Sequence, residues 1–415
     1  MDNKKNGIPK LRFPGFTGAW EQRKLGDIAV IFDGTHQTPK YTDSGIKFVS
    51  VENIATLETE KYISQKAYEN EYSNKQAEKG DILMTRIGNI GTAKIIEKDE
   101  PLAYYVTLAL LKPQNIDSNF LVWGISSPEV QRNIWKLTLH IAFPKKINLG
   151  EINQVTINIP SSSEQKKIGE FFQQLDSLIA LHQRKLEHLQ EQKKGLLQKM
   201  FPKTGEIVPE VRFPGFTDAW EQRKFSEILA KSDGLRRGPF GSALKKEFFI
   251  SSSEYTVYEQ NNAIYNTWKT RYFITPEKFQ ELHKFQLVPG DFILSGAGTI
   301  GRIAQVPANI TKGVFNQALI RIRINPEWMD KNFFLIWMQS ENMQRKLTQA
   351  NPGSAMTNLV PMSEIKKWEI IIPSKAEQNK IGEFIQKLNS LITLHQRKLD
   401  HLELMKKGLL QQMFV

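Results

Sequence analysis

Three glycines after an apolar run have the spacing that most suggests chemistry. Gly296-x-Gly298-x-x-Gly301 matches a dinucleotide fingerprint, in which glycines let the backbone approach a pyrophosphate at a helix N-terminus. The residues that follow, 302–306 and then Pro307, look like a strand, so no helix N-terminus is expected there. The spacing therefore favours a glycine-rich turn between strands, which would still allow close backbone approach to a ligand.

Other catalytic patterns are short or incomplete. Ser163-x-x-Lys166 and Ser363-x-x-Lys366 fit a nucleophile pattern, but the first overlaps a predicted helix start. Glu364-x-Lys366 resembles the end of a nuclease carboxylate-lysine cluster without a matching acidic pair before it. The chain lacks a GxxxxGK[ST] loop, an HExxH arrangement and the Asn/Asp-Pro-Pro-Tyr sequences of amino-methyltransferases, and its cysteine count of 0 excludes thiolate chemistry and cysteine-bound zinc or iron-sulfur sites. Catalysis by this chain has little support.

Charge gives a clearer indication. The 415 residues hold 56 Lys and Arg against 44 Asp and Glu, a net charge of +12, which favours a polyanionic partner. Basic and polar residues cluster in 34–40 and at Lys145-Lys146, Arg236-Arg237 and Lys245-Lys246. Guanidinium, ammonium, amide and hydroxyl groups suit both phosphate contacts and base-edge reading, although a solvated loop explains any single cluster equally well.

The elements that must position these clusters occur twice. Residues 12–24 (RFPGFTGAWEQRK) recur as 212–224 (RFPGFTDAWEQRK), identical at 12 of 13 positions, and 168–201 recur as 381–414, identical at 25 of 34. The segments between these blocks diverge strongly. The chain is therefore a leader, a variable domain and a tail, written twice.

Each tail predicts a long helix of about 37 residues, roughly 55 Å. Ser161-x-x-Glu164 and Ser374-x-x-Glu377 have the spacing of a capping box. Apolar residues then follow alternating steps of four and three, with His182 and His395 at equivalent positions. The predicted seam comprises Ile168, Phe172, Leu175, Ile179, Leu186 and Leu189 in the first tail, and Ile381, Ile385, Leu388, Ile392, Leu399 and Leu402 in the second. This heptad pattern indicates a coiled coil between the two tails, which we expect to be antiparallel with a pseudo-twofold relation, and the histidines are interpreted as register-setting polar residues in preference to metal ligands.

The variable domains have mixed patterns. Strand-like runs are 46–51, 82–85, 105–111, 155–159, 292–294, 318–324 and 369–372, and helical spacing covers 119–135 and 332–347. We therefore expect an α+β fold, with two mixed α/β domains whose sheets are mostly antiparallel or mixed, separated by two long antiparallel coiled-coil helices.

This layout resembles the specificity subunit of a type I restriction-modification system over essentially the whole chain. The resemblance rests on the Pro-Ser-x-x-Glu-Gln-x-x-Ile-Gly-Glu-Phe openings at Pro160 and Pro373, Gly-Asp-Ile-Leu at Gly80 and Pro-Phe-Gly-Ser-Ala-Leu at Pro239. The expected division is 1–24 leader, 25–160 target recognition domain 1, 161–202 central conserved helix, 203–224 repeated leader or linker, 225–373 target recognition domain 2 and 374–415 C-terminal conserved helix.

The resemblance implies a non-catalytic chain in which each recognition domain reads one half of an asymmetric bipartite site in double-stranded DNA. The helices would act as spacer and docking surface. Methyltransferase (modification) subunits would carry S-adenosylmethionine, and restriction subunits with motor and nuclease activity would use ATP and Mg, so this chain itself would bind no cofactor. The sequence shows no hydrophobic signal segment or membrane span, so we expect a cytoplasmic protein.

The predicted DNA contacts come from the basic and polar loops. They are His36, Gln37, Lys40, Arg86 and Lys145 in the first domain, and Arg236, Arg237, Lys245, Arg302 and Asn316 in the second. No residue is predicted to be catalytic or to bind a metal. Two alternatives stay open: a self-sufficient DNA-modifying enzyme with an unrecognised motif, and a coiled-coil scaffold that does not bind DNA. The near-identical tails also suggest that residues 1–202 alone could pair as a homodimer.

Overall fold

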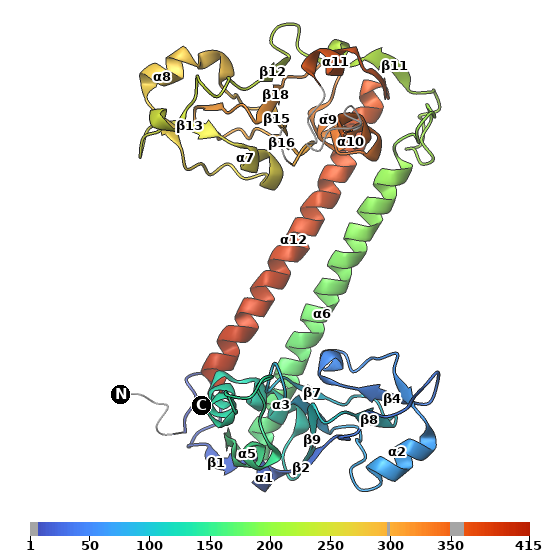
Figure 1. The fold of residues 1–415 in the computed structure, drawn as a ribbon, viewed down its shortest axis with the longest axis vertical. Coiled ribbons are helices and arrows are strands. Elements are labelled where there is room, and N and C mark those ends of the chain that lie inside the picture. The colour runs from blue at the N-terminus through green and yellow to red at the C-terminus, as the bar shows by residue number, and fades with distance from the viewer. Residues whose placement is uncertain (1–6, 297–298, 349–360) are drawn as a thin grey trace. The chain divides into compact units, whose positions relative to one another are not determined.

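The computed structural model describes residues 7–296, 299–348 and 361–415. Gly298 of the glycine motif lies outside these ranges. The chain forms two compact units: unit 1 contains residues 1–184 and 395–415, and unit 2 contains residues 185–394 (Figure 1). Each unit thus combines one variable segment with parts of both long helices.

Unit 1 is built on two four-stranded sheets. The first has the order β2-β9-β6-β7 and is antiparallel, and the second has the order β3-β5-β4-β8, in which β4 and β8 are parallel. Its elements are β1 (Glu21–Lys24), α1 (Leu25–Ile28), β2 (Ala29–Asp33), β3 (Tyr41–Thr42), β4 (Ile46–Val49), η2 (Val51–Asn53), β5 (Tyr62–Ile63), α2 (Gln65–Tyr72), β6 (Ile82–Thr85), β7 (Ala93–Ile95), β8 (Leu102–Tyr104), β9 (Leu108–Pro113), α3 (Ser118–Ser126), α4 (Pro128–Leu137), α5 (Leu149–Gln154), β10 (Thr156–Ile159) and the start of α6 (Ser162–Lys199).

Unit 2 repeats this plan. Its four-stranded antiparallel sheet has the order β12-β18-β15-β16, and a three-stranded sheet has the order β14-β13-β17. Its elements are β11 (Glu221–Lys224), η3 (Phe225–Ile228), β12 (Leu235–Arg237), η4 (Lys246–Phe248), β13 (Tyr255–Tyr258), α7 (Gln260–Tyr265), β14 (Phe273–Ile274), α8 (Pro276–Glu281), η5 (His283–Phe285), β15 (Phe292–Ser295), β16 (Ile303–Gln305), β17 (Gly313–Phe315), β18 (Leu319–Ile322), α9 (Lys331–Met338), α10 (Glu341–Thr348), α11 (Met362–Lys367), β19 (Glu369–Ile372) and the start of α12 (Lys375–Met413).

The long helices are antiparallel, as predicted. Within unit 1, Asp176 of α6 accepts a hydrogen bond from Lys406 of α12 at 2.5 Å, and His182 meets His395 with 3.0 Å between their Nδ1 atoms. Residue numbers rise along one helix as they fall along the other, which only an antiparallel pair allows. Figure 1 shows these parts of α6 and α12 beside one another in this unit.

The repeated leader and tail join through a buried ion pair in each unit. Arg12 donates to both carboxylate oxygens of Glu164 at 2.8 and 2.7 Å, and Arg212 does the same to Glu377 at 2.9 and 2.7 Å. Helices α6 and α12 start directly after Ser161 and Ser374, as the capping-box spacing predicts, and Ser374 Oγ accepts a hydrogen bond from the Glu377 N–H at 3.4 Å. The carboxylates of the two glutamates are held by guanidinium groups, which sequence spacing could not reveal.

Three predicted elements differ from the structure. Helix 119–135 is interrupted at Ser127, whose side chain caps α4 and which precedes Pro128, a residue that disfavours helical geometry in its predecessor. Helix 332–347 is likewise interrupted between α9 and α10. The predicted strand 105–111 starts later, at Leu108, because the chain turns at Tyr105 as it passes from one sheet to the other, with Leu108 N–H donating to Tyr105 at 2.9 Å.

Gly169 in α6 shows why glycine occupies this position of the tail. A Cβ atom there would lie 2.7 Å from Asp117 Oδ1 and 2.8 Å from Asn119 Cβ, at the start of α3. Gly382 in α12 makes the same close approach to Asp330. In each unit the glycine therefore lets the long helix pack directly against the start of a domain helix.

Candidate nucleic-acid interface

In unit 1, three loops meet at the end of the sheet β2-β9-β6-β7 where strands β2 and β6 finish, here called the sheet edge. Segment 34–40 follows β2, segment 86–91 follows β6, and segment 138–147 leads into α5. The backbone joins the last two: Ile147 N–H donates to the Arg86 carbonyl at 3.0 Å, and Gly88 N–H donates to the Lys145 carbonyl at 3.1 Å. The sheet thus gathers residues that are far apart in sequence.

Asp33, at the end of β2, organises two of the predicted contact residues. Its Oδ2 atom lies 2.7 Å from His36 Nε2 and accepts a hydrogen bond from Arg86 at 3.2 Å. Burial alone would raise the pKa of Asp33, but the hydrogen bond from His36 and the nearby charges of His36 and Arg86 hold it below its ordinary value. The carboxylate therefore stays ionised and fixes two basic side chains from different loops.

The other predicted residues of unit 1 differ in accessibility. The Arg86 side chain is only 11% exposed and also approaches the Ile147 carbonyl at 3.4 Å, so much of its donor capacity is satisfied within the protein. In contrast, His36, Gln37, Lys40 and Lys145 are exposed. The arrangement can present ammonium, amide and imidazole groups to a ligand, with Arg86 behind them.

Unit 2 places part of its predicted set at the corresponding sheet edge. Arg236 and Arg237 lie on β12, where Arg236 Nε donates to Asp233 at 2.5 Å and Arg237 Nε donates to the Gln317 carbonyl at 3.3 Å. Asn316 lies beside this strand, since a Cβ atom on Gly238 would be 1.9 Å from the Asn316 carbonyl oxygen. These three predicted residues are therefore neighbours.

Lys245 and Arg302 belong to other segments of unit 2. Lys245 pairs with Glu247 at 3.4 Å, and Arg302 is exposed, with its backbone N–H donating to Ser295 Oγ at 2.9 Å. Among the described residues, no hydrogen bond or ion pair joins them to Arg236, Arg237 or Asn316. The strand after the glycine motif, β16, confirms the prediction that no helix begins there.

Sequence reasoning missed the groups that hold this region of unit 2 together. Arg321 on β18 is buried and pairs with Asp233, while Arg323 donates to Asp291 at 2.7 Å and to Asp233 at 3.2 Å. Buried charges of this kind are stable only when paired. An arginine inside the strand-like run 318–324 was the available signal, because an apolar strand rarely carries one without a partner.

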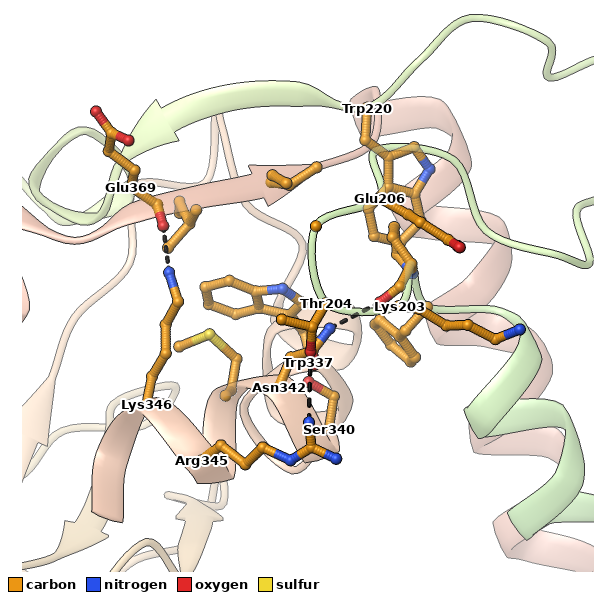
Figure 2. Close-up of a pocket in the computed structure, with 16 residues that line it drawn as sticks. Lys203, Thr204, Glu206, Trp220, Trp337, Ser340, Asn342, Arg345, Lys346 and Glu369 are labelled. Atoms are coloured by element: carbon orange, nitrogen blue, oxygen red, sulfur yellow. Dashed lines mark hydrogen bonds between the residues drawn. The ribbon is translucent and has the colours of Figure 1, made fainter. Parts of the chain in front are cut away.

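A cavity of about 270 Å³ in unit 2 lies where the segment after α6 meets α10 (Figure 2). Its walls include Trp220 and Trp337, but its polar groups largely satisfy one another. Asn342 donates to the Pro202 carbonyl at 2.7 Å and Lys346 donates to the Glu369 carbonyl at 2.5 Å. Burial lowers the pKa of Lys346. The cavity is therefore best explained as the packing of the linker on the domain.

The predicted helix seam is buried or half-buried at each of its twelve positions. At the histidine position, the 3.0 Å contact between two Nδ1 atoms requires one ring to donate and the other to accept. The described residues contain no group of three or more His, Cys, Asp or Glu that could hold a metal ion. No helix in the described ranges is long and apolar enough to cross a membrane.

Four of the leucines that remain exposed outside this seam form a repeated pair on the long helices. Leu178 and Leu181 of α6 are 41% and 54% exposed, and Leu391 and Leu394 of α12 are each 47% exposed. They occupy equivalent positions of the repeated tail, so each unit presents the same apolar pair. An apolar pair that stays exposed in both copies is a feature of binding surfaces.

Comparisons with known proteins agree with the duplicated architecture. The family model described as "Type I restriction modification DNA specificity domain" matches residues 18–191 and again 218–404. A Methanocaldococcus jannaschii protein named as the MjaX specificity subunit of a type I restriction enzyme is 24% identical over 94% of this chain and 92% of its own length.

Two solved structures share the fold. The type I restriction-modification S subunit from M. genitalium has a TM-score of 0.62 at 13% identity and covers 98% of this chain and 99% of its own. A chain from a structure on complex assembly and conformational transition of the type I system has a TM-score of 0.55 at 12% identity, covering 97% and 98%. The two family matches together span most of the sequence, and the protein therefore belongs to the family of type I restriction-modification DNA specificity subunits, which recognise DNA and are not catalytic.

Proposed function

We propose that this chain reads an asymmetric bipartite site in double-stranded DNA, with one half-site for each recognition domain. The observation that carries the proposal is the repeated sheet, β2-β9-β6-β7 and β12-β18-β15-β16, whose edge bears loops of different sequence in the two units. A common scaffold with different loops suits two readers of different sequences. We also propose that residues 1–24 form the leader, 25–160 the first recognition domain, 161–202 the central helix, 203–224 the linker, 225–373 the second recognition domain and 374–415 the C-terminal helix.

The predicted contact residues are proposed to act in two ways. Exposed groups such as His36, Gln37 and Lys40 reach bases and phosphates, where amides and cations make specific and electrostatic contacts respectively. Arg86 is a positioning residue in the free protein, because its Nε and one Nη1 N–H already donate to the Ile147 carbonyl and to Asp33. In unit 2, Arg237 and Arg302 are the exposed arginines of the proposed set.

The exposed leucines support a docking role for the long helices. We propose that a methyltransferase subunit covers Leu178 and Leu181, and that a second copy covers Leu391 and Leu394, because equivalent surfaces accept equivalent partners. The partner would hold S-adenosylmethionine, and restriction subunits would use ATP and Mg, which leaves this chain with recognition and assembly, proposed to occur in the cytoplasm. The spacing between half-sites would depend on the lengths of α6 and α12, since each reader is continuous with one of these helices.

Methylation-aware sequencing of host DNA tests the proposal. Cells that carry the methyltransferase subunit are compared with and without this chain, and we expect one asymmetric bipartite motif to be methylated only when it is present. Arg86→Ala and Arg302→Ala are then tested separately, with the expectation that each weakens methylation through its own half-site. Methylation by the purified chain alone would favour the self-sufficient enzyme, and absence of salt-sensitive DNA binding by the complex would favour the scaffold.

A further inference from the structure

Segment 140–145 of unit 1, here called the tip segment, exposes two large apolar side chains. Ile141 and Phe143 have relative exposures of 99% and 105%, so neither is buried against the rest of the protein. Single exposed apolar residues are common, but two on alternate residues of one loop leave a concentrated apolar surface that a binding partner can cover.

The tip segment has a fixed base. Leu139 N–H donates to the Lys146 carbonyl at 2.8 Å and closes the loop, while Ile147 N–H donates to the Arg86 carbonyl at 3.0 Å. Gly88 N–H also donates to the Lys145 carbonyl at 3.1 Å. The C-terminal side of the loop is therefore tied to the turn after β6, and Leu139 holds the other side to it, so the tip belongs to the proposed DNA-reading edge of unit 1.

The chemistry beside the tip favours DNA over a protein partner. Lys145 and Lys146 directly follow the apolar residues and are exposed. Lysine is depleted in the cores of protein–protein interfaces. In contrast, DNA-binding proteins that insert an apolar side chain such as Phe or Ile between base steps use neighbouring cations to bind the phosphates. The tip carries both components within six residues.

We propose that the tip segment is a wedge that places Phe143, with Ile141 beside it, against base faces at one base-pair step of the half-site read by the first recognition domain. The inference rests on the proposed function and adds a contact made through base stacking. Partial unstacking costs less at pyrimidine-purine steps, so the wedge would select a deformable step without hydrogen bonds to its bases.

The test uses the complex of the full chain with its methyltransferase subunit. The probe is duplex DNA that contains the sequence motif methylated by the complex. One version has ordinary bases, and in further versions 2-aminopurine replaces each adenine of the first half-site in turn. Phe143→Ala is compared with Phe143→Trp, which keeps an aromatic face, with Lys145→Ala, and with Tyr265→Ala, which removes an exposed aromatic of unit 2 outside the proposed interface. Because Phe143 is fully exposed, its replacement should not unfold the protein, so a loss of DNA binding by these variants would reflect the lost contact.

We expect Phe143→Ala to weaken binding about 5- to 150-fold, the range for losing one base-aromatic stack. The salt dependence should stay the same, because no phosphate contact is lost, whereas Lys145→Ala should reduce the slope by about one. The 2-aminopurine signal of unstacking should fall with Phe143→Ala and persist with Phe143→Trp, and Tyr265→Ala should match wild type.

Other outcomes separate the wedge from the proposed function. Equal affinity and equal fluorescence for wild type and Phe143→Ala would overturn the wedge and leave the proposed function intact. Loss of methyltransferase binding by Phe143→Ala, with unchanged DNA affinity once assembled, would overturn it in favour of a protein-docking tip. A wild-type complex without sequence-selective DNA binding would overturn both.

Discussion

Phe414 offers the most demanding test of how the units are built, because a residue at the end of the chain closes the core of the first variable domain. Its ring lies 5.6 Å from Phe120, 5.9 Å from Phe172 and 6.0 Å from Trp20, and the residue is only 4% exposed. Phe201 is its counterpart in unit 2, where its ring lies 5.9 Å from that of Phe333. Each helix end thus completes one core.

Phe414→Ala should destabilise unit 1 by about 3–5 kcal/mol, the usual effect of emptying a buried aromatic site. Such a loss is a large fraction of the ~5–15 kcal/mol that stabilises a typical domain. Amide hydrogen exchange resolved by peptide is the appropriate assay, because it reports each unit separately. Because each 1.4 kcal/mol is a factor of ten, amides of β6 and β9 should exchange roughly 10²- to 10⁴-fold faster, while β15 and β18 keep their protection.

Phe201→Ala is the matched control and should give the reverse pattern. Faster exchange confined to unit 2 in the Phe414→Ala variant, or unchanged exchange in β6 and β9, would refute this account of the core. A global stability measurement alone would not suffice, since two units that unfold separately do not yield one free energy of unfolding.

Three further predictions concern single features. Gly169→Ala should destabilise unit 1, because the new Cβ would overlap the start of α3. Gly195→Ala, at an open helical position, is its control, and wild-type hydrogen exchange of β6 and β9 in the Gly169→Ala variant would contradict the close approach. Hydrogen bonds from Lys47 and Lys98 lower the pKa of Glu58 to about 2, so its contribution to stability is present above its unfolded value near 4.5 and is lost as pH falls toward 2. The Glu58→Gln variant should therefore be less stable than wild type above about pH 4.5, and this difference in stability should shrink as the pH falls toward 2. A difference in denaturant midpoints that does not change with pH would argue against this ion pair. Residues 1–202 alone should form a concentration-dependent homodimer, because the second copy can supply the helix end that Phe414 supplies here; light scattering that shows only monomer would exclude it.

Periodicity predicted the long helices well because their seam spacing is set by helix geometry and repeats over many turns. Strands such as β6 were also predictable, since its four residues form one buried run. The break at Ser127 has a local signal, because Pro128 disfavours helical geometry in the residue before it, whereas the sheet change at Tyr105 depends on which strands the chain pairs with, and local patterns do not contain this information. In the same way, the basic clusters were visible in sequence, but their organisation by Asp33 required the end of β2 to meet the turn after β6.

The identical and divergent parts of the two copies have separate structural roles. Arg12 and Glu164 connect a repeated leader to a repeated tail, and Gly169 lets the tail approach its domain, so changes at these places alter the scaffold. Residues 36–40 and 140–145 instead lie at the sheet edge, where substitution changes what is exposed without breaking the pairing of β2, β9 and β6. If the edge reads DNA, a new loop can change one half-site while the ion pair, the glycine and the helix ends keep the reader assembled. The division also explains why the strongest stability effects are expected from leader and tail residues, and the strongest specificity effects from the loops between them.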